Sequence, residues 1–347
     1  MDTAAFDYDL PEARIAQEPV EPRDSARLLV DVLTGADHRR VRDLPDLLDP
    51  GDLVVVNRTR VMPARLRLVK PTGGAVEVLL LARRGPTTWE ALVRPGRRVP
   101  PGTVLHHPAG PGVLSVTVGD VVGDGIRLVE LDRGAPGGLL AGIEAAGEVP
   151  LPPYIRESRV DPERYQTVFS HRSEPESSAA PTAGLHLSHQ VLDRLPERGV
   201  QVADVELIVG LGTFRPIEVD KVEDHQMHAE RYAVPEATMA ACADTRARGG
   251  RVLAVGTTAV RALESAAATG QLEGHTELFI HAGFDFRVVD RLMTNFHLPR
   301  SSLLVMIDAF AGPRWRGLYS LALAGDYRFL SFGDAMLLTR HDRWEVA

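Results

Sequence analysis

The chain of 347 residues contains a single cysteine, Cys242. One cysteine excludes an intramolecular disulfide and leaves no thiolate cluster for a structural metal site. The sequence also lacks the Gly-rich dinucleotide fingerprint, the phosphate-binding loop with Gly-Lys-Ser, and the serine nucleophile elbow. These absences disfavour an ordinary dehydrogenase, NTPase or α/β-hydrolase.

Signals for export or membrane insertion are also missing. Residues Met1–Leu10 carry acidic side chains where a signal peptide carries basic ones before an apolar stretch. The late apolar run Leu303–Ala311 is interrupted by Asp308 and is too short to cross a bilayer. We therefore expect a cytoplasmic protein with no membrane partner.

The formal net charge is −8, from 39 Lys and Arg against 47 Asp and Glu. This balance disfavours indiscriminate nucleic-acid binding, which needs a broad basic surface. Two local basic clusters are candidate RNA contacts, although such clusters most often lie on solvated surface. The first comprises Arg58, Arg60, Arg65, Arg67 and Lys70, and the second comprises Arg94, Arg97 and Arg98.

The segment after Pro63 has the pattern of a small antiparallel barrel. Gly- and Pro-rich turns separate short strand-like runs, and no convincing helix interrupts them. The expected strands are Ala75–Leu81, Trp89–Val93, Val113–Val118 and Ile126–Leu131. We predict an inserted domain at residues 63–150.

The remainder of the chain predicts an α/β domain, because strands alternate with helices from Ser188 onward. The expected strands are Asp52–Val56, Val200–Val209, Arg251–Val255, Glu277–Ile280 and Leu303–Ile307. The expected helices are Ser188–Leu195, Pro235–Gly249, Thr258–Ala268 and Trp315–Leu323. The predicted fold class is therefore an α/β main domain, with a barrel-like mixed sheet and helices, formed by residues 1–62 and 151–347 and interrupted by the antiparallel β-barrel.

Several short polar segments lie beside strand-like runs and combine turn-forming residues with His, Thr, Asn or Arg. They are Asn57–Arg60, Pro181–His186, Gly212–Pro216, Gly256–Arg261 and Thr294–Pro299. α/β enzymes build their pockets from loops at the ends of several strands. A histidine in one such turn is more often structural than catalytic, but several turns of this kind in one chain favour a shared active site.

Gly256-Thr257-Thr258 joins a predicted strand to a predicted helix. The free amides and dipole of that helix end favour a carboxylate or a phosphate. Alternatively, one of the two threonines only caps the helix. Arg261 and Glu264 stand three residues apart on one helix face, where they can also pair with each other.

His225, His228 and Glu230 form a separate candidate cluster. Their spacing differs from that of the zinc-protease helix, and no cysteine completes a structural zinc site. An acid–base or hydrogen-bonding role is therefore favoured over a metal site.

Taken together, these blocks resemble the S-adenosylmethionine:tRNA ribosyltransferase-isomerases of queuosine biosynthesis. The similarity runs through nearly the full length in one order. Its blocks are Phe6–Pro11, Glu21–Asp24, Val76–Leu81, Trp89–Gly96, Pro152–Ile155, Arg164–Thr167, Ala180–His186, Gly210–Pro216, His225–Glu230, Gly256–Thr258, Thr294–Pro299, Tyr327–Phe329 and Gly333–Met336.

The resemblance implies an α/β main domain with an inserted β-barrel, and it implies a reaction. The ribosyl group of S-adenosylmethionine is transferred and isomerised onto 7-aminomethyl-7-deazaguanine at the tRNA wobble position, giving epoxyqueuosine, adenine and methionine. S-adenosylmethionine is then a co-substrate, tRNA is the partner, and no metal or redox cofactor is expected. A base is needed at C5′ beside the sulfonium, and an acid is needed for the departing adenine.

Under this resemblance the base and the acid are expected among His186, His225, His228, Glu230 and His297. The expected S-adenosylmethionine-binding residues are Asn57, Arg60, Thr182, Gly184, Gly212, Thr213, Thr257, Thr258, Arg261 and Asn295. Within this set, Gly256–Thr258 and Arg261 are expected to hold the methionine carboxylate or a phosphate. No metal ligand is predicted.

Three positions depart from the family pattern: Arg58 replaces an Asp, Ile208 replaces a His, and Leu187-Ser188 replaces Phe-Thr. Two alternatives follow. One is a divergent paralogue that transfers the ribosyl group to a small molecule or to water. The other is a catalytically silent tRNA-binding homologue. The sequence does not specify an oligomeric state.

Overall fold

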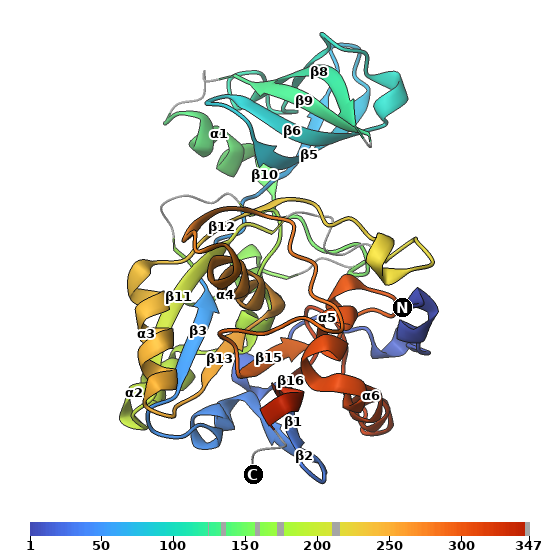
Figure 1. The fold of residues 1–347 in the computed structure, drawn as a ribbon. Helices are drawn as coiled ribbons and strands as arrows, with labels where there is room; N and C mark the ends of the chain where they lie inside the picture. The colour runs from blue at the N-terminus through green and yellow to red at the C-terminus, as the bar shows by residue number, and fades with distance from the viewer. Residues whose placement is uncertain (124, 133–136, 157–159, 172–176, 210–215, 344–347) are drawn as a thin grey trace. The chain divides into compact units, whose positions relative to one another are not determined.

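The computed structural model describes residues 1–123, 125–132, 137–156, 160–171, 177–209 and 216–343 (Figure 1). The chain divides into two compact units. The first, or main, unit comprises Met1–Thr59, Pro152–His171 and Ala180–Ala347, and the second comprises Arg60–Leu151 and Arg172–Ala179. The junctions expected from the sequence lay at residues 62/63 and 150/151.

A mixed nine-stranded sheet forms the centre of the main unit, in the order β14-β12-β11-β3-β13-β15-β16-β1-β2. The strands are β1 (Arg27–Val32), β2 (Gly35–Arg40), β3 (Leu53–Asn57), β11 (Gln201–Leu207), β12 (Glu230–Ala233), β13 (Val252–Val255), β14 (Glu273–Thr276), β15 (Arg291–Asn295) and β16 (Ala335–Thr339). Strands β11, β3, β13 and β15 are mutually parallel, whereas β12, β14, β16 and β2 each run antiparallel to a neighbour. Every residue of β3, β13 and β15 is buried, as is typical of parallel strands covered on both faces.

Among the described residues, five α-helices pack around this sheet: α2 (His189–Glu197), α3 (Glu236–Ala247), α4 (Thr257–Thr269), α5 (Ser302–Ala311) and α6 (Trp315–Ala324). Figure 1 shows α2 and α3 beside β11 and β3, and α5 and α6 towards β16 and β1. Ser188 caps α2 as predicted, since its hydroxyl accepts a hydrogen bond from the Val191 N–H at 3.2 Å. None of the helices in the described residues is both long and apolar enough to cross a membrane.

Short 3₁₀ turns link many of these elements. In the main unit they are η1 (Thr3–Phe6), η2 (Glu12–Arg14), η3 (Arg23–Ser25), η4 (Val41–Leu47), η6 (Pro162–Tyr165), η7 (Thr182–His186), η9 (Val222–Asp224), η10 (Gly312–Arg314) and η11 (His341–Arg343). Of these, η7 contains part of one polar segment singled out in the sequence. It packs against β15, which brings two of those segments together.

Two strand predictions in the main unit were wrong. Residues 303–307 lie in helix α5, whose first turn is capped by the Ser301 hydroxyl at 3.2 Å from the Leu304 N–H. A short continuous apolar run does not distinguish a buried strand from a buried helix, and the cap decided the outcome. Residues 277–280 do not form a strand, because β14 ends before them, at Thr276. The strand that pairs with β13 on this side is β15.

The second unit contains a closed antiparallel barrel. Its six strands are β4 (Arg65–Val69), β5 (Ala75–Arg83), β6 (Thr88–Arg94), β9 (Ile126–Leu131), β8 (Ser115–Gly123) and β7 (Val104–His106). Closure follows because β4 pairs with both β5 and β7. The short β10 (Gly147–Glu148) adds to β4, η5 (Gly96–Arg98) follows β6, and α1 (Leu139–Ala146) is a helix that the sequence analysis did not expect. Together the two units confirm the predicted fold class.

Candidate active site

A cavity opens in the main unit where three parallel strands end. Val209 follows β11, Gly256 follows β13, and Asn295 is the last residue of β15. Its empty volume, counted together with the space that is open to solvent, is about 640 Å³. The lining residues are Tyr154, Ala180, Pro181, Thr182, Ala183, Val209, Gly256, Thr257, Thr258, Thr294, Asn295, Phe296, His297, Leu298, Ser301, Leu303, Leu330 and Ser331.

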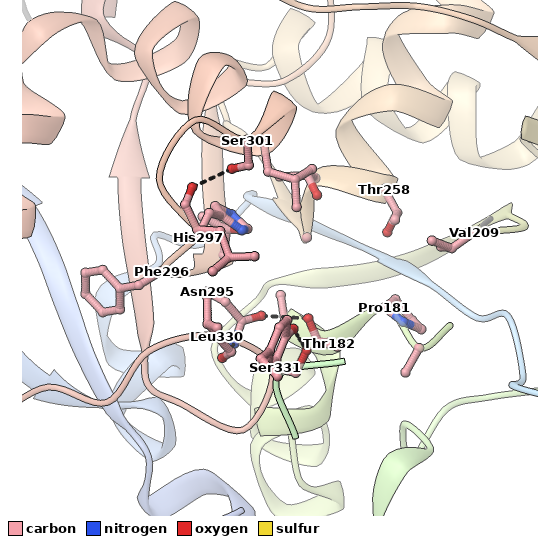
Figure 2. Close-up of a pocket in the computed structure, with 18 residues that line it drawn as sticks. Pro181, Thr182, Val209, Thr258, Asn295, Phe296, His297, Ser301, Leu330 and Ser331 are labelled. Carbon is pink, nitrogen blue, oxygen red and sulfur yellow. Dashed lines mark hydrogen bonds between the residues drawn. The ribbon is translucent and has the colours of Figure 1, made fainter. Parts of the chain in front are cut away.

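Three of the polar segments found in the sequence meet around this cavity. Figure 2 shows Thr182, Thr258, Asn295 and His297 around the same space. The Thr182 hydroxyl donates to the Asn295 side-chain oxygen at 3.0 Å, and the Asn295 amide donates to the Leu330 carbonyl at 3.0 Å. Asn295 therefore joins η7 to the turn at Leu330 across the cavity wall.

His297 is buried in the cavity wall. Its Nε2 lies 2.9 Å from the Thr294 hydroxyl oxygen, and its backbone N–H donates to the Tyr319 hydroxyl oxygen at 3.0 Å. The Tyr8 hydroxyl donates to the His297 carbonyl. Burial lowers the pKa of His297 to about 3, so its imidazole is neutral at physiological pH. A neutral ring can accept a proton but cannot donate one as an imidazolium.

His186 is equally buried, but it does not line the cavity. Its Nδ1 lies 3.0 Å from the Ala183 carbonyl oxygen and its Nε2 lies 2.9 Å from the Gly333 carbonyl oxygen. Burial lowers the pKa of His186, although both carbonyls oppose that shift. With both ring nitrogens directed at backbone oxygens, His186 connects η7 to the Gly333 turn instead of facing a substrate.

Helix α4 begins at the cavity. Gly256 precedes it with φ +92°, a conformation that favours glycine. Neither threonine is the N-cap of the helix, because Gly256 occupies that position and the helix begins at Thr257. Thr257 and Thr258 both line the cavity, and the buried Thr258 hydroxyl has no hydrogen-bond partner in the part of the chain that the structure describes. The free amides and this hydroxyl therefore face an empty space.

Arg261, one turn into α4, does not reach the cavity lining. Its guanidinium forms a buried ion pair with Glu230 and donates to the Leu278 carbonyl at 3.1 Å. Glu264 instead accepts the backbone N–H groups of residues 287–289, at 2.9, 3.0 and 2.9 Å. The pairing of Arg261 with Glu264 considered from the sequence is therefore wrong. The two side chains have separate buried partners.

Two further predicted histidines also lie outside the lining. His225 is half-buried and packs edge-on against the Phe279 ring, with centroids 5.3 Å apart. Burial lowers its pKa, with a smaller contribution from the exposed His228. Within the described ranges, no group of three or more His, Cys, Asp or Glu is arranged to hold a metal ion.

The remaining predicted binding residues have varied positions. Asn57 is buried, and its side chain bonds both the N–H and the carbonyl of Leu207, which joins the ends of β3 and β11. A Cβ on Gly184 would approach the Phe169 ring at 2.8 Å, so this glycine permits close packing. Arg60 belongs to the second unit. Gly212 and Thr213 lie outside the described residues.

The family model described as "Queuosine biosynthesis protein" matches residues 3–338. This chain belongs to the queuosine biosynthesis family. An S-adenosylmethionine:tRNA ribosyltransferase-isomerase of Thermus thermophilus is 51% identical over 348 residues, covering 96% of this chain and 98% of the relative. The enzyme of the same name from Moorella thermoacetica is 51% identical over 341 residues, with the same two coverages.

A solved structure also resembles this member of the queuosine biosynthesis family. The crystal structure of an S-adenosylmethionine tRNA ribosyltransferase from Thermotoga maritima has a TM-score of 0.54 and 37% sequence identity. The match covers 96% of this chain and 99% of that one.

The departures from the queuosine family pattern all lie outside the cavity lining. The Arg58 Nε lies 2.9 Å from a Glu206 oxygen, and another of its nitrogens lies 3.1 Å from Asp204, so β11 supplies two opposite charges. Leu187 is fully buried in the core. Ile208 uses its backbone N–H to bond the Arg231 carbonyl at 2.9 Å. None of these residues contributes to the described lining of the cavity.

The sequence analysis of this family member missed a pair of hydroxyl groups in the cavity wall. Tyr154 and Ser331 lie 2.6 Å apart, oxygen to oxygen, although 177 positions separate them in the chain. Burial raises the pKa of Tyr154 to about 12, so the phenol keeps its proton at neutral pH. Ser331 follows Leu330, which has φ +69°, a strained value for a bulky residue. The block Pro152–Ile155 was noted, but no strand end or catalytic residue type drew attention to Tyr154.

Proposed function

We infer that this chain is an S-adenosylmethionine:tRNA ribosyltransferase-isomerase. It transfers and isomerises the ribosyl group of S-adenosylmethionine onto 7-aminomethyl-7-deazaguanine at the tRNA wobble position, and adenine and methionine leave. The observation that carries this conclusion is the full-length similarity to enzymes of that name at 51% identity. S-adenosylmethionine is a co-substrate, and the reaction needs no metal or redox cofactor. A cytoplasmic location follows from the tRNA substrate.

We assign S-adenosylmethionine to the cavity at the start of α4. In this proposal, the methionine carboxylate accepts hydrogen bonds from the Thr257 and Thr258 hydroxyls and from free amides of the first turn. The Thr182–Asn295 pair supplies further polar contacts. Gly212 and Thr213 keep their expected roles on the strength of the resemblance.

His297 is the proposed base. If its Nε2 carries the ring proton and donates to Thr294, the Nδ1 lone pair is free to accept a proton from C5′ beside the sulfonium. Burial keeps the imidazole neutral at physiological pH, so its lone pair is not already protonated. Three other candidates then act as positioning residues. Both ring nitrogens of His186 face backbone carbonyls, and Glu230 and Arg261 form an ion pair with each other.

The Tyr154–Ser331 pair is the proposed contact for adenine. Two hydroxyls share one hydrogen bond, so one of the two hydrogens is left to donate to a ligand. A ring nitrogen of adenine is an acceptor of the right kind. We propose that this hydrogen bond strengthens as the glycosidic bond breaks and its electron pair moves onto adenine.

Adenine release tests this function and both alternatives. The purified protein is incubated with S-adenosylmethionine, with or without tRNA that carries 7-aminomethyl-7-deazaguanine, and adenine is quantified by chromatography. We expect adenine only with the modified tRNA, in a one-to-one ratio with epoxyqueuosine measured by mass spectrometry of the digested tRNA. Release without tRNA would indicate transfer to water or a small molecule. No release under any condition would indicate a silent tRNA-binding protein.

A further inference from the structure

Arg300 stands beside the proposed active site without lining it. Leu298, two residues before it, and Ser301, directly after it, both line the cavity. Ser301 also caps α5, so Arg300 directly precedes the N-cap of that helix. The side chain of Arg300 therefore starts from the rim of the cavity.

The backbone at Arg300 is held in a strained conformation. Its φ is +54°, in the left-handed region that residues with a side chain rarely adopt. The Arg300 N–H donates to the Phe6 carbonyl at 2.9 Å, and its carbonyl accepts the Ile217 N–H at 2.8 Å. Backbone strain of this kind is concentrated at functional sites. Two separate segments thus fix an unfavourable conformation at this one arginine.

The guanidinium of Arg300 has no partner among the residues described by the structure. Its Nε is inaccessible to solvent and makes no hydrogen bond, and no acidic group pairs with it. Nearby arginines behave differently. Arg316 pairs with Asp308 and donates to the Ala5 carbonyl, and Arg314 pairs with Asp31. A strained, half-buried and unpaired cation beside a cavity indicates a site for an anion.

We propose that Arg300 binds a backbone phosphate of the tRNA next to the wobble nucleotide. This inference rests on the proposed function. The guanidinium fork matches two phosphate oxygens, and a residue at the rim reaches a neighbouring nucleotide while the wobble base enters the cavity. A protein with net charge −8 has no general attraction for RNA, so individual cations placed at the site must supply it.

The test compares R300M with R316M, which removes a neighbouring arginine that already has an acidic partner. KM for tRNA and KM for S-adenosylmethionine are measured at several salt concentrations. For R300M we expect KM for tRNA to rise about five- to tenfold and its logarithmic salt dependence to fall by about one, while KM for S-adenosylmethionine stays constant. R300K should keep most of the salt dependence, and R316M should match the parent protein.

Two outcomes would overturn the proposal. A rise in KM for S-adenosylmethionine alone would place the methionine carboxylate at Arg300, and unchanged values for both substrates would leave it without a ligand. Failure of the proposed function looks different, because the parent protein would then show no tRNA-dependent adenine release. Circular dichroism and filter binding of tRNA without S-adenosylmethionine separate misfolding from loss of the contact.

Discussion

His297 and His186 are both buried histidines in turns that follow or flank strands, yet their ring nitrogens meet different partners. His297 lines the cavity and shares one nitrogen with the Thr294 hydroxyl. Both nitrogens of His186 are directed at backbone carbonyls, away from the cavity. The same contrast separates the cavity wall from buried polar residues that do not line it, namely His186, Glu230, Arg261 and Glu264, which we describe as lying behind the wall. Among these, Arg261 and Glu230 pair with each other.

This contrast teaches that residue type does not distinguish a catalytic group from a structural one. Residues in the wall keep an unused donor or acceptor, as Thr258 does. Residues behind the wall have their polar atoms occupied, as Glu264 does with three backbone N–H groups. Substitutions in the wall should therefore reduce turnover, and substitutions behind it should reduce stability.

The largest effect is expected behind the wall, at Glu230. E230Q leaves the buried Arg261 guanidinium without a compensating charge, which should lower the free energy of unfolding by about 3–5 kcal/mol, measured by urea denaturation. E223Q is the matched control, because Glu223 is exposed and pairs only with the N-terminus in the described chain. The double variant E230L/R261M should lose less stability than E230Q. If E230Q lowered the free energy of unfolding by less than about 1 kcal/mol, the Glu230–Arg261 pair would not be an important structural contact.

In the wall, H297Q should lower the rate of adenine formation roughly 100-fold, the usual scale for a general base. Its unfolding midpoint should change little, because glutamine can keep the bond to Thr294.

H186Q serves as the counterpart behind the wall. It should lose about 1–3 kcal/mol of stability through its unsatisfied carbonyl partners, with turnover of the folded enzyme within a few-fold of the parent. The reverse pattern would contradict the comparison.

Acid should destabilise the protein through both histidines. Burial lowers their folded-state pKa values, to about 3 for His297, from the ordinary value of 6.5. As the pH falls below 6.5, the unfolded chain takes up protons that the folded protein does not, so stability is lost, at up to about 1.4 kcal/mol per pH unit for each histidine. Urea unfolding at pH 7.5, 6.0 and 5.0 should show a shallower loss in H297Q. An unchanged slope would mean that His297 is protonated in the folded state.

The smallest effect is expected for the Tyr154–Ser331 pair. Y154F or S331A should reduce adenine release or raise KM for S-adenosylmethionine by about two- to tenfold, the value of one neutral hydrogen bond. Because the two hydroxyls act as one unit, the double variant should be little worse than either single variant. S320A, at an exposed serine whose hydroxyl bonds the Arg316 carbonyl, is the control. Additive losses would show that the hydroxyls act separately.

The sequence predicted those parts of the fold in which local pattern and burial agree. The β-branched run of β3 and the Gly-Thr-Thr start of α4 carry their structure in a few adjacent residues. The predicted strand at residues 303–307 was wrong, because an apolar run fits either a strand or a helix and the cap at Ser301 makes this one helix α5. Register and pairing of short strands such as β14 depend on distant neighbours, which local propensity does not reveal.

The candidate site was predictable only in part for a similar reason. Turns at strand ends identified Thr182, Thr258, Asn295 and His297 as neighbours, because parallel strands bring their carboxyl ends to one edge. The partner of Arg261 lies 31 residues away, and a nearer acid on the same helix face was the local expectation. Hydroxyl pairs such as Tyr154–Ser331 leave no local pattern at all.

The turn at Leu330 has an evolutionary consequence. Its left-handed backbone is maintained by the Asn295 amide and by the Phe296 carbonyl, to which the Leu330 N–H donates at 3.1 Å. A mutation to glycine would relax this backbone strain, on the order of 1–3 kcal/mol, but it would also remove a buried leucine side chain, which costs about 2–5 kcal/mol. Selection for a stable fold and selection for a fixed Ser331 therefore both favour keeping a buried side chain in this left-handed turn.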